Sequence, residues 1–106
     1  MTDKIVVLVT AGSQREAAKI ARNLVESRLA ACVNISPPVR SIYRWEGKIQ
    51  NDSEFLLLIK TKRSLFRAVK ESILQIHSYT TPEVIALPVT EGSQAYLRWI
   101  DDSLSR

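Results

Sequence analysis

The order of apolar and polar positions divides the chain into seven predicted elements, of which the first two begin near the N-terminus. Ile5–Val9 is a continuous and mostly β-branched apolar run, which is typical of a central strand buried on both faces. Ser13 and Glu16 have the spacing of a capping box, in which each side chain accepts a hydrogen bond from the backbone N–H of the other residue. Apolar residues then recur at helical spacing, so we predict a helix from Ser13 to Leu29.

A long hairpin is predicted in the middle of the chain. A second strand begins at Ala30–Ile35, and Pro37-Pro38 place it at a sheet edge or give it a kink, because proline has no N–H for the ladder. The strand-like stretch Val39–Ile49 follows, then a polar turn at Gln50–Ser53 and a return strand at Glu54–Lys62.

The C-terminal part completes an α+β pattern. Ser64 is positioned to cap a second helix, which ends before Pro82. Glu83–Thr90 is a fourth strand, at an edge because it contains Pro88, and Gly92-Ser93 begins a last helix. The order β-α-β-β-α-β-α predicts a ferredoxin-like fold with an antiparallel sheet and an added C-terminal helix, in one domain over residues 1–106.

The hairpin also predicts an oligomer. Val39–Ile49 spans about 36 Å as a strand, whereas the first helix covers only about 25 Å, so the hairpin projects past the helices. The projecting part carries Tyr43 and Trp45 on one face and Ile42 on the other, and such residues need cover. A symmetric oligomer supplies that cover; the alternative is a hairpin that bends back at a bulge near Gly47.

Composition restricts location and chemistry. The chain has 106 residues, 45% of them hydrophobic, and a net charge of +4, with one cysteine and one histidine. We find no signal peptide and no run of about 20 apolar residues, so we expect a cytoplasmic protein with no membrane contact. Cys32 lies among apolar neighbours and is expected to be a buried structural thiol.

Candidate chemistry is sparse. Glycine-rich phosphate loops are absent. Cys32 and His77 could in principle pair as nucleophile and base, but Cys32 is better explained as a structural thiol, so no enzyme is expected. The expected central strand Ile5–Val9 has no aromatic residue on which a base could stack, so no nucleic-acid partner is expected. His77 is expected to cap a helix, with metal binding possible where side chains of several subunits converge.

A cleft between subunits is the other predicted site, because oligomers of this fold can bind small molecules between loops of neighbouring subunits. The candidate residues are polar or charged and lie in or near the hairpin and the following loops: Cys32, Arg44, Glu46, Lys48, Lys60, Tyr79 and Glu83.

Several motifs together resemble those of the CutA divalent-cation-tolerance family over nearly the whole chain. The most distinctive is Ser-Ile-Tyr-Arg-Trp-Glu-Gly-Lys-Ile at Ser41–Ile49, with Leu29–Asn34 before it and Leu58–Thr61 after it. Tyr79, Pro82 and Glu83 then match the C-terminal pattern.

The resemblance implies a homotrimer built through the long hairpin, with Tyr43, Trp45 and Gly47 at the interface, and a likeness to PII signalling proteins. It also implies a non-enzymatic role in tolerance of divalent cations, copper especially, with Cu²⁺ or another divalent cation bound weakly. Its ligand positions correspond to Val9, Ile76 and His77, and only His77 has a ligating side chain. The alternative functions are a PII-like sensor of a small anionic ligand and a scaffold for a protein partner.

Overall fold

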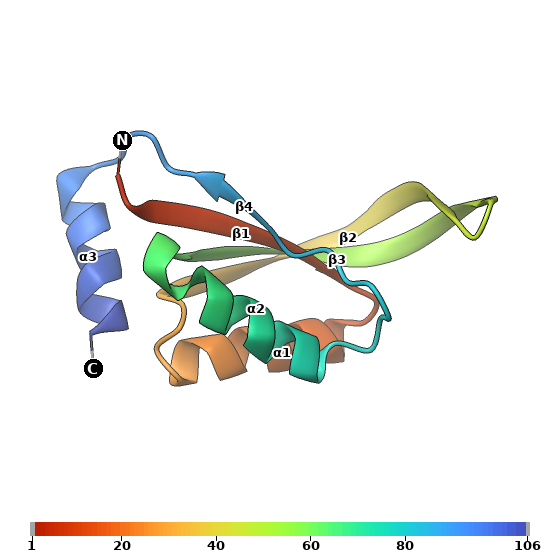
Figure 1. The fold of residues 1–106 in the computed structure, drawn as a ribbon, viewed down its shortest axis with the longest axis horizontal. Helices are drawn as coiled ribbons and strands as arrows, with labels where there is room; N and C mark the ends of the chain where they lie inside the picture. Colours follow the sequence, from red (N-terminus) through yellow and green to blue (C-terminus); the bar gives the residue numbers. More distant parts are fainter. Residues whose placement is uncertain (1, 106) are drawn as a thin grey trace.

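The protein is built on one four-stranded antiparallel sheet with helices α1 and α2 on one of its faces, as Figure 1 shows for the computed structural model, which describes residues 2–105. The strand order is β2-β3-β1-β4. The elements are β1 (Lys4–Ala11), α1 (Gln14–Glu26), β2 (Cys32–Trp45), β3 (Lys48–Lys62), α2 (Phe66–Ile76), β4 (Ile85–Pro88) and α3 (Gln94–Leu104). The predicted ferredoxin-like class with a C-terminal helix is confirmed.

The core lies between the sheet and helices α1 and α2. In β1, Ile5, Val7 and Val9 are buried on the helix side, whereas Val6 and Leu8 alternate with them and are only half-buried. The expectation of burial on both faces is therefore met on one face only, because among residues 2–105 no helix covers the opposite face (Figure 1). That face presents apolar side chains to the outside of the chain.

Helix α1 begins as predicted and ends earlier. Ser13 Oγ accepts a hydrogen bond from the Glu16 N–H at 3.1 Å, but the Glu16 carboxylate accepts from the Ser78 N–H at 2.9 Å instead of returning to Ser13. Only one of the two hydrogen bonds of the capping box is formed, because the Glu16 carboxylate accepts from Ser78, which is distant in the sequence, and not from the Ser13 N–H. The helix ends at Glu26 instead of Leu29, and Arg28 has a left-handed backbone (φ 60°) that turns the chain away.

The later elements differ from prediction in their starts and lengths. Leu65, not Ser64, occupies the N-cap position of α2, and a short 3-10 turn over Arg63–Leu65 precedes the helix. Strand β4 is shorter than Glu83–Thr90 and covers Ile85–Pro88, at the sheet edge as its proline indicated.

Helix α3 is fastened to one end of the sheet by a small apolar cluster and an ion pair. Ile100 and Leu104 pack with Ala31, and the buried Lys4 ammonium lies 3.1 Å from the Asp101 carboxylate. None of the helices formed by residues 2–105 combines the length and apolar character that a bilayer span requires.

The two prolines of β2 have the predicted effect. Strand β2 is an edge strand, and its pairing with β3 shifts register between Ile35 and Pro38. The strand nevertheless continues through the irregularity to Trp45, so the hairpin arms are 14 and 15 residues long.

The hairpin turn is not where the polar residues predicted it. It lies at Glu46-Gly47, where both residues have positive φ (50° and 78°), as a two-residue turn between right-twisted strands requires. Gln50–Ser53 belong to β3 and pair with Tyr43–Arg40. The prediction failed because this part of the hairpin lies outside the core, where strand residues need not be apolar.

The hairpin projects beyond the helices, as expected from its length (Figure 1). Strand β1 ends at Ala11 opposite Phe55, so the part of β3 before Phe55 pairs only with β2. The projection makes the molecule 44 Å long but only 25 Å wide. Ile42 and Ile49 on it are 70% and 62% exposed.

The turn allows a direct test of its backbone. Gly47→Ala should lower the free energy of unfolding by about 1–2 kcal/mol, because a Cβ is strained at positive φ although the space around Gly47 is open. Gly47→Asn is the matched control and should cost less, since asparagine tolerates this conformation. Urea unfolding of both variants measures the difference; equal costs would contradict a backbone origin.

Candidate functional site

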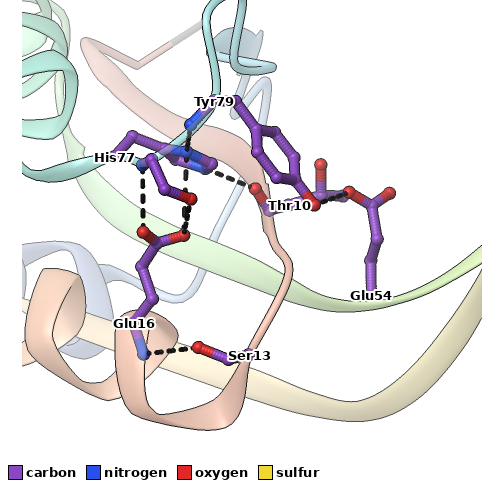
Figure 2. Close-up of polar contacts among 7 residues, drawn as sticks. Thr10, Ser13, Glu16, Glu54, His77 and Tyr79 are labelled. Atoms are coloured by element: carbon purple, nitrogen blue, oxygen red, sulfur yellow. Dashed lines mark hydrogen bonds and ion pairs between the residues drawn. The ribbon is translucent and has the colours of Figure 1, made fainter.

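His77 lies at the end of α2 with its side chain fully buried, and both of its ring nitrogens are engaged (Figure 2). Nε2 is 2.7 Å from the Thr10 carbonyl oxygen, which only accepts, so Nε2 carries the proton. Nδ1 accepts from the Tyr79 N–H at 3.1 Å, so it presents its lone pair. The ring is therefore a neutral imidazole that joins the turn after α2 to the end of β1.

Glu16 holds the same turn from the other side. Its carboxylate accepts from the backbone N–H of Ser78 at 2.9 Å and from the Ser78 hydroxyl at 3.2 Å. One carboxylate oxygen is also 3.7 Å from His77 Nδ1. The start of α1, the end of α2 and the end of β1 thus converge on the turn and fix its direction.

Tyr79 reaches from this turn toward the hairpin (Figure 2). Its hydroxyl donates to the Glu54 carboxylate at 2.7 Å, and its ring is 4.6 Å from the His77 ring, centroid to centroid. Burial, and then the bond to Glu54, raise the pKa of Tyr79 far above its ordinary value, so the hydroxyl stays a donor. A Cβ at Gly12 would lie 3.0 Å from this hydroxyl, so glycine there permits the close approach.

An open groove of about 640 Å³ lies between the projecting hairpin and the turn. Its walls include Tyr43 and Trp45 from β2, Glu54 from β3, and Tyr79 and Glu83 from the turn and the segment after it. Tyr43 donates its hydroxyl proton to Asp52, which lies next to the groove on the same hairpin. The groove therefore combines aromatic walls with carboxylates.

The charged residues that line the groove are all acidic. The other lining residues are neutral, and Glu54 is only 5% exposed. Burial, and then the nearby Glu54, raise the pKa of Glu83 above its ordinary value, as expected where carboxylates gather without a cation. Within one chain this charge favours a cationic occupant over the small anion considered from the sequence.

The predicted site residues fall into two groups. Tyr43, Trp45, Tyr79 and Glu83 line the groove, and His77 lies beneath it as a support of the turn. The others lie elsewhere and are placed as follows: Arg44 and Gly47 at the outer end of the hairpin, Glu46 and Lys48 in and after its turn, and Cys32 and Lys60 opposite each other in the β2–β3 ladder.

Cys32 and Glu54 show where sequence reasoning failed. Cys32 is half-buried at the start of an edge strand, so the expectation of a buried thiol was wrong; an apolar neighbourhood in sequence does not bury the first residue of an edge. Glu54 was missed as a site residue, because it precedes the apolar run Phe55–Ile59 and reads as its polar flank. Only the register of β3 and the turn's path bring it to Tyr79.

No group of three or more His, Cys, Asp or Glu side chains within residues 2–105 is placed to hold a metal ion. His77 is the one ring ligand, and both of its nitrogens already have partners. A metal that bound His77 would have to replace the hydrogen bond of Thr10 or that of Tyr79.

Comparisons with known proteins agree on one family. The family model described as "CutA1 divalent ion tolerance protein" matches residues 5–103. "Divalent-cation tolerance protein CutA" of Thermus thermophilus is 50% identical over 98 residues, which are 92% of this chain and 95% of the relative. "Protein CutA, chloroplastic" of Arabidopsis thaliana is 50% identical over 99 residues, 93% of this chain but only 54% of the relative.

Solved structures give the same result. The structure described as the periplasmic divalent cation tolerance protein CutA of Archaeoglobus fulgidus has a TM-score of 0.94 at 41% identity, covering 96% of this chain and 99% of that one. CutA of Xylella fastidiosa has a TM-score of 0.95 at 38% identity, covering 98% and 100%. The chain spans about half the length of the mouse and human relatives that it matches.

The role of His77 can be tested by one substitution that removes both hydrogen bonds and by two that each keep one. His77→Ala should lower the free energy of unfolding by about 2–4 kcal/mol, because it leaves the Thr10 carbonyl and the Tyr79 N–H without partners. His77→Asn retains an acceptor near Tyr79 and His77→Gln a donor near Thr10, so each should lose less. Denaturant unfolding of the three variants measures this, and three equal losses would contradict the assignment.

Proposed function

This chain belongs to the CutA1 divalent ion tolerance family, and from that premise we propose that it acts in tolerance of divalent metal ions as a homotrimer without catalytic activity. The observation that carries the metal-tolerance role is the 50% identity, over nearly all of both chains, to a protein named for divalent-cation tolerance. The family name describes a tolerance protein and not an enzyme.

Three features of the chain support assembly. The hairpin projects into solvent with Ile42 and Ile49 mostly exposed, and one face of the sheet has no helix over it within residues 2–105. The outer strands of the sheet, β2 and β4, each have a free hydrogen-bonding edge. Contacts between different surfaces of identical chains form a closed ring when the rotation between neighbours closes. The number three is part of the proposal and comes from what the family resemblance implies.

Metal binding to this protein is proposed to be weak. The resemblance supplies His77 as the ligand, and a metal there competes with hydrogen bonds that each contribute roughly 1 kcal/mol and leave buried groups unpaired when broken. Further ligands come from other subunits in this proposal. Copper is the first cation to test.

The other expectations remain proposals. Residues of one chain give the groove negative charge, so a sensor of a small anion would need cations from a neighbouring subunit. A cytoplasmic location remains our prediction, whereas the names of two related proteins place them in a chloroplast and in a periplasm.

The assembly is tested by placing a charge on the hairpin. The protein should scatter light as a particle of three times its 12.0 kDa chain mass. Ile42→Glu should dissociate it, because Ile42 is 70% exposed in one chain and a charge there is costly only when covered. Leu74→Glu on α2, where Leu74 is 49% exposed, is the matched control and should leave the mass unchanged. A wild type of single-chain mass would refute the trimer.

Metal binding and tolerance are tested separately. Calorimetric titration with Cu²⁺ and Zn²⁺ should give weak binding that His77→Gln reduces; identical isotherms for wild type and variant would remove His77 from the site. Expression in a bacterial host lacking its own CutA should raise the Cu²⁺ concentration that halves growth. An unchanged concentration would count against the tolerance role.

A further inference from the structure

The groove is an incomplete site within one chain. Glu54 and Glu83 both line it, and neither has an ion-pair partner among residues 2–105. Glu54 receives one hydrogen bond, from Tyr79, and is 5% exposed. A buried carboxylate with no cation nearby is costly, so the walls are built for an occupant that supplies positive charge.

The aromatic residues of the groove narrow the chemistry of that occupant. Tyr43, Trp45 and Tyr79 all contribute to its walls beside the two carboxylates. A guanidinium group binds carboxylates through its fork of N–H donors and stacks on aromatic rings at the same time. An arginine side chain therefore fits this combination better than a compact ammonium or an anion.

The projecting hairpin carries two arginines, and Arg40 already donates a hydrogen bond from its Nε to Asn51, so Arg44 is the better candidate. It lies on the same hairpin as the groove wall, but strand alternation directs it to the opposite face from Tyr43 and Trp45. It does not line the groove of its own chain and has no ion-pair partner among residues 2–105. Its cross-strand neighbour is Ile49, one of the most exposed apolar residues, so its face also lacks cover.

We propose that Arg44 of a second copy of this chain enters the groove and places its guanidinium between Glu54 and Glu83, against the aromatic walls. This rests on the proposed homotrimer and names the contact that completes it. The same docking covers Ile49 beside Arg44. Because the contact joins the hairpin of one copy to the groove of another, it has a direction and recurs around a closed ring.

The pairing also explains why the charges are arranged as they are. An ion pair that is desolvated on assembly fixes register and orientation, because any other docking leaves the buried Glu54 without a charged partner. Lys48 provides a comparison, since it is a nearby cation on the same projection but pairs across the turn with Trp45.

The test compares the thermal midpoints of Arg44→Gln, Glu83→Gln and the double variant at pH 7. Each single variant should unfold about 2–4 °C below the wild type. The double variant should fall no further than Arg44→Gln alone, because Arg44→Gln already removes the contact with Glu83. Lys48→Gln combined with Glu83→Gln should instead show additive shifts. Additive shifts for Arg44 with Glu83, or a higher midpoint for Glu83→Gln, would overturn the pairing.

Mixing shows whether the contact joins two copies. Arg44→Gln chains unfolded and refolded together with Glu83→Gln chains regain some intact pairs only if the pair is between subunits. The mixture should then have a higher midpoint than either variant alone; a midpoint no higher would overturn the proposal. Light scattering of each sample separates the homotrimer hypothesis from the Arg44 contact. A monomeric wild type would refute the trimer, whereas a trimer whose thermal midpoints shift additively would refute only the Arg44 contact.

Discussion

Strand β3 is longer than the strand it pairs with inside the sheet, and the rest of the molecule depends on that mismatch. Strand β1 ends at Ala11 opposite Phe55, while β3 extends back to Lys48 with β2 as its only partner. The space that β1 leaves beside the outer part of β3 is where the turn after α2 reaches the hairpin, through the bond from Tyr79 to Glu54. The overhang, the groove and the exposed aromatic residues all follow from one strand ending early.

The wall opposite the hairpin is a turn without regular structure, and polar contacts to two neighbouring elements hold it in place. His77 connects it to β1 and Glu16 connects it to α1, so each neighbouring element contributes one anchor. Such contacts are directional, and those of His77 leave buried groups unsatisfied if the turn moves. Tyr79 and Glu83 are therefore presented to the groove from a defined backbone, although they lie outside helices and strands.

The sequence predicted the structure well where a residue is buried in the core or where proline restricts the backbone. Apolar periodicity located the helices and the strand parts beside the core, and prolines identified both edges, because burial and missing N–H groups act locally. It failed at Gln50–Ser53, which are polar yet lie in a strand, because nothing buries that part of the hairpin. It also missed Glu54, whose partner Tyr79 is 25 positions away. The family motifs pointed to Tyr79 and Glu83, whereas the network around His77 needed the three-dimensional structure.

The irregularity at Pro37-Pro38 limits how far a strand of another molecule can pair along the outer edge of β2. Neighbouring residues of an edge strand direct their amides alternately inward and outward, so two consecutive prolines remove the outward donor whichever residue faces out. A strand that adds to β2 from outside therefore meets a break between the outer half of the hairpin and the half beside the core. The free edge is thereby divided into two short segments, which protects a long exposed strand against open-ended fibrous stacking.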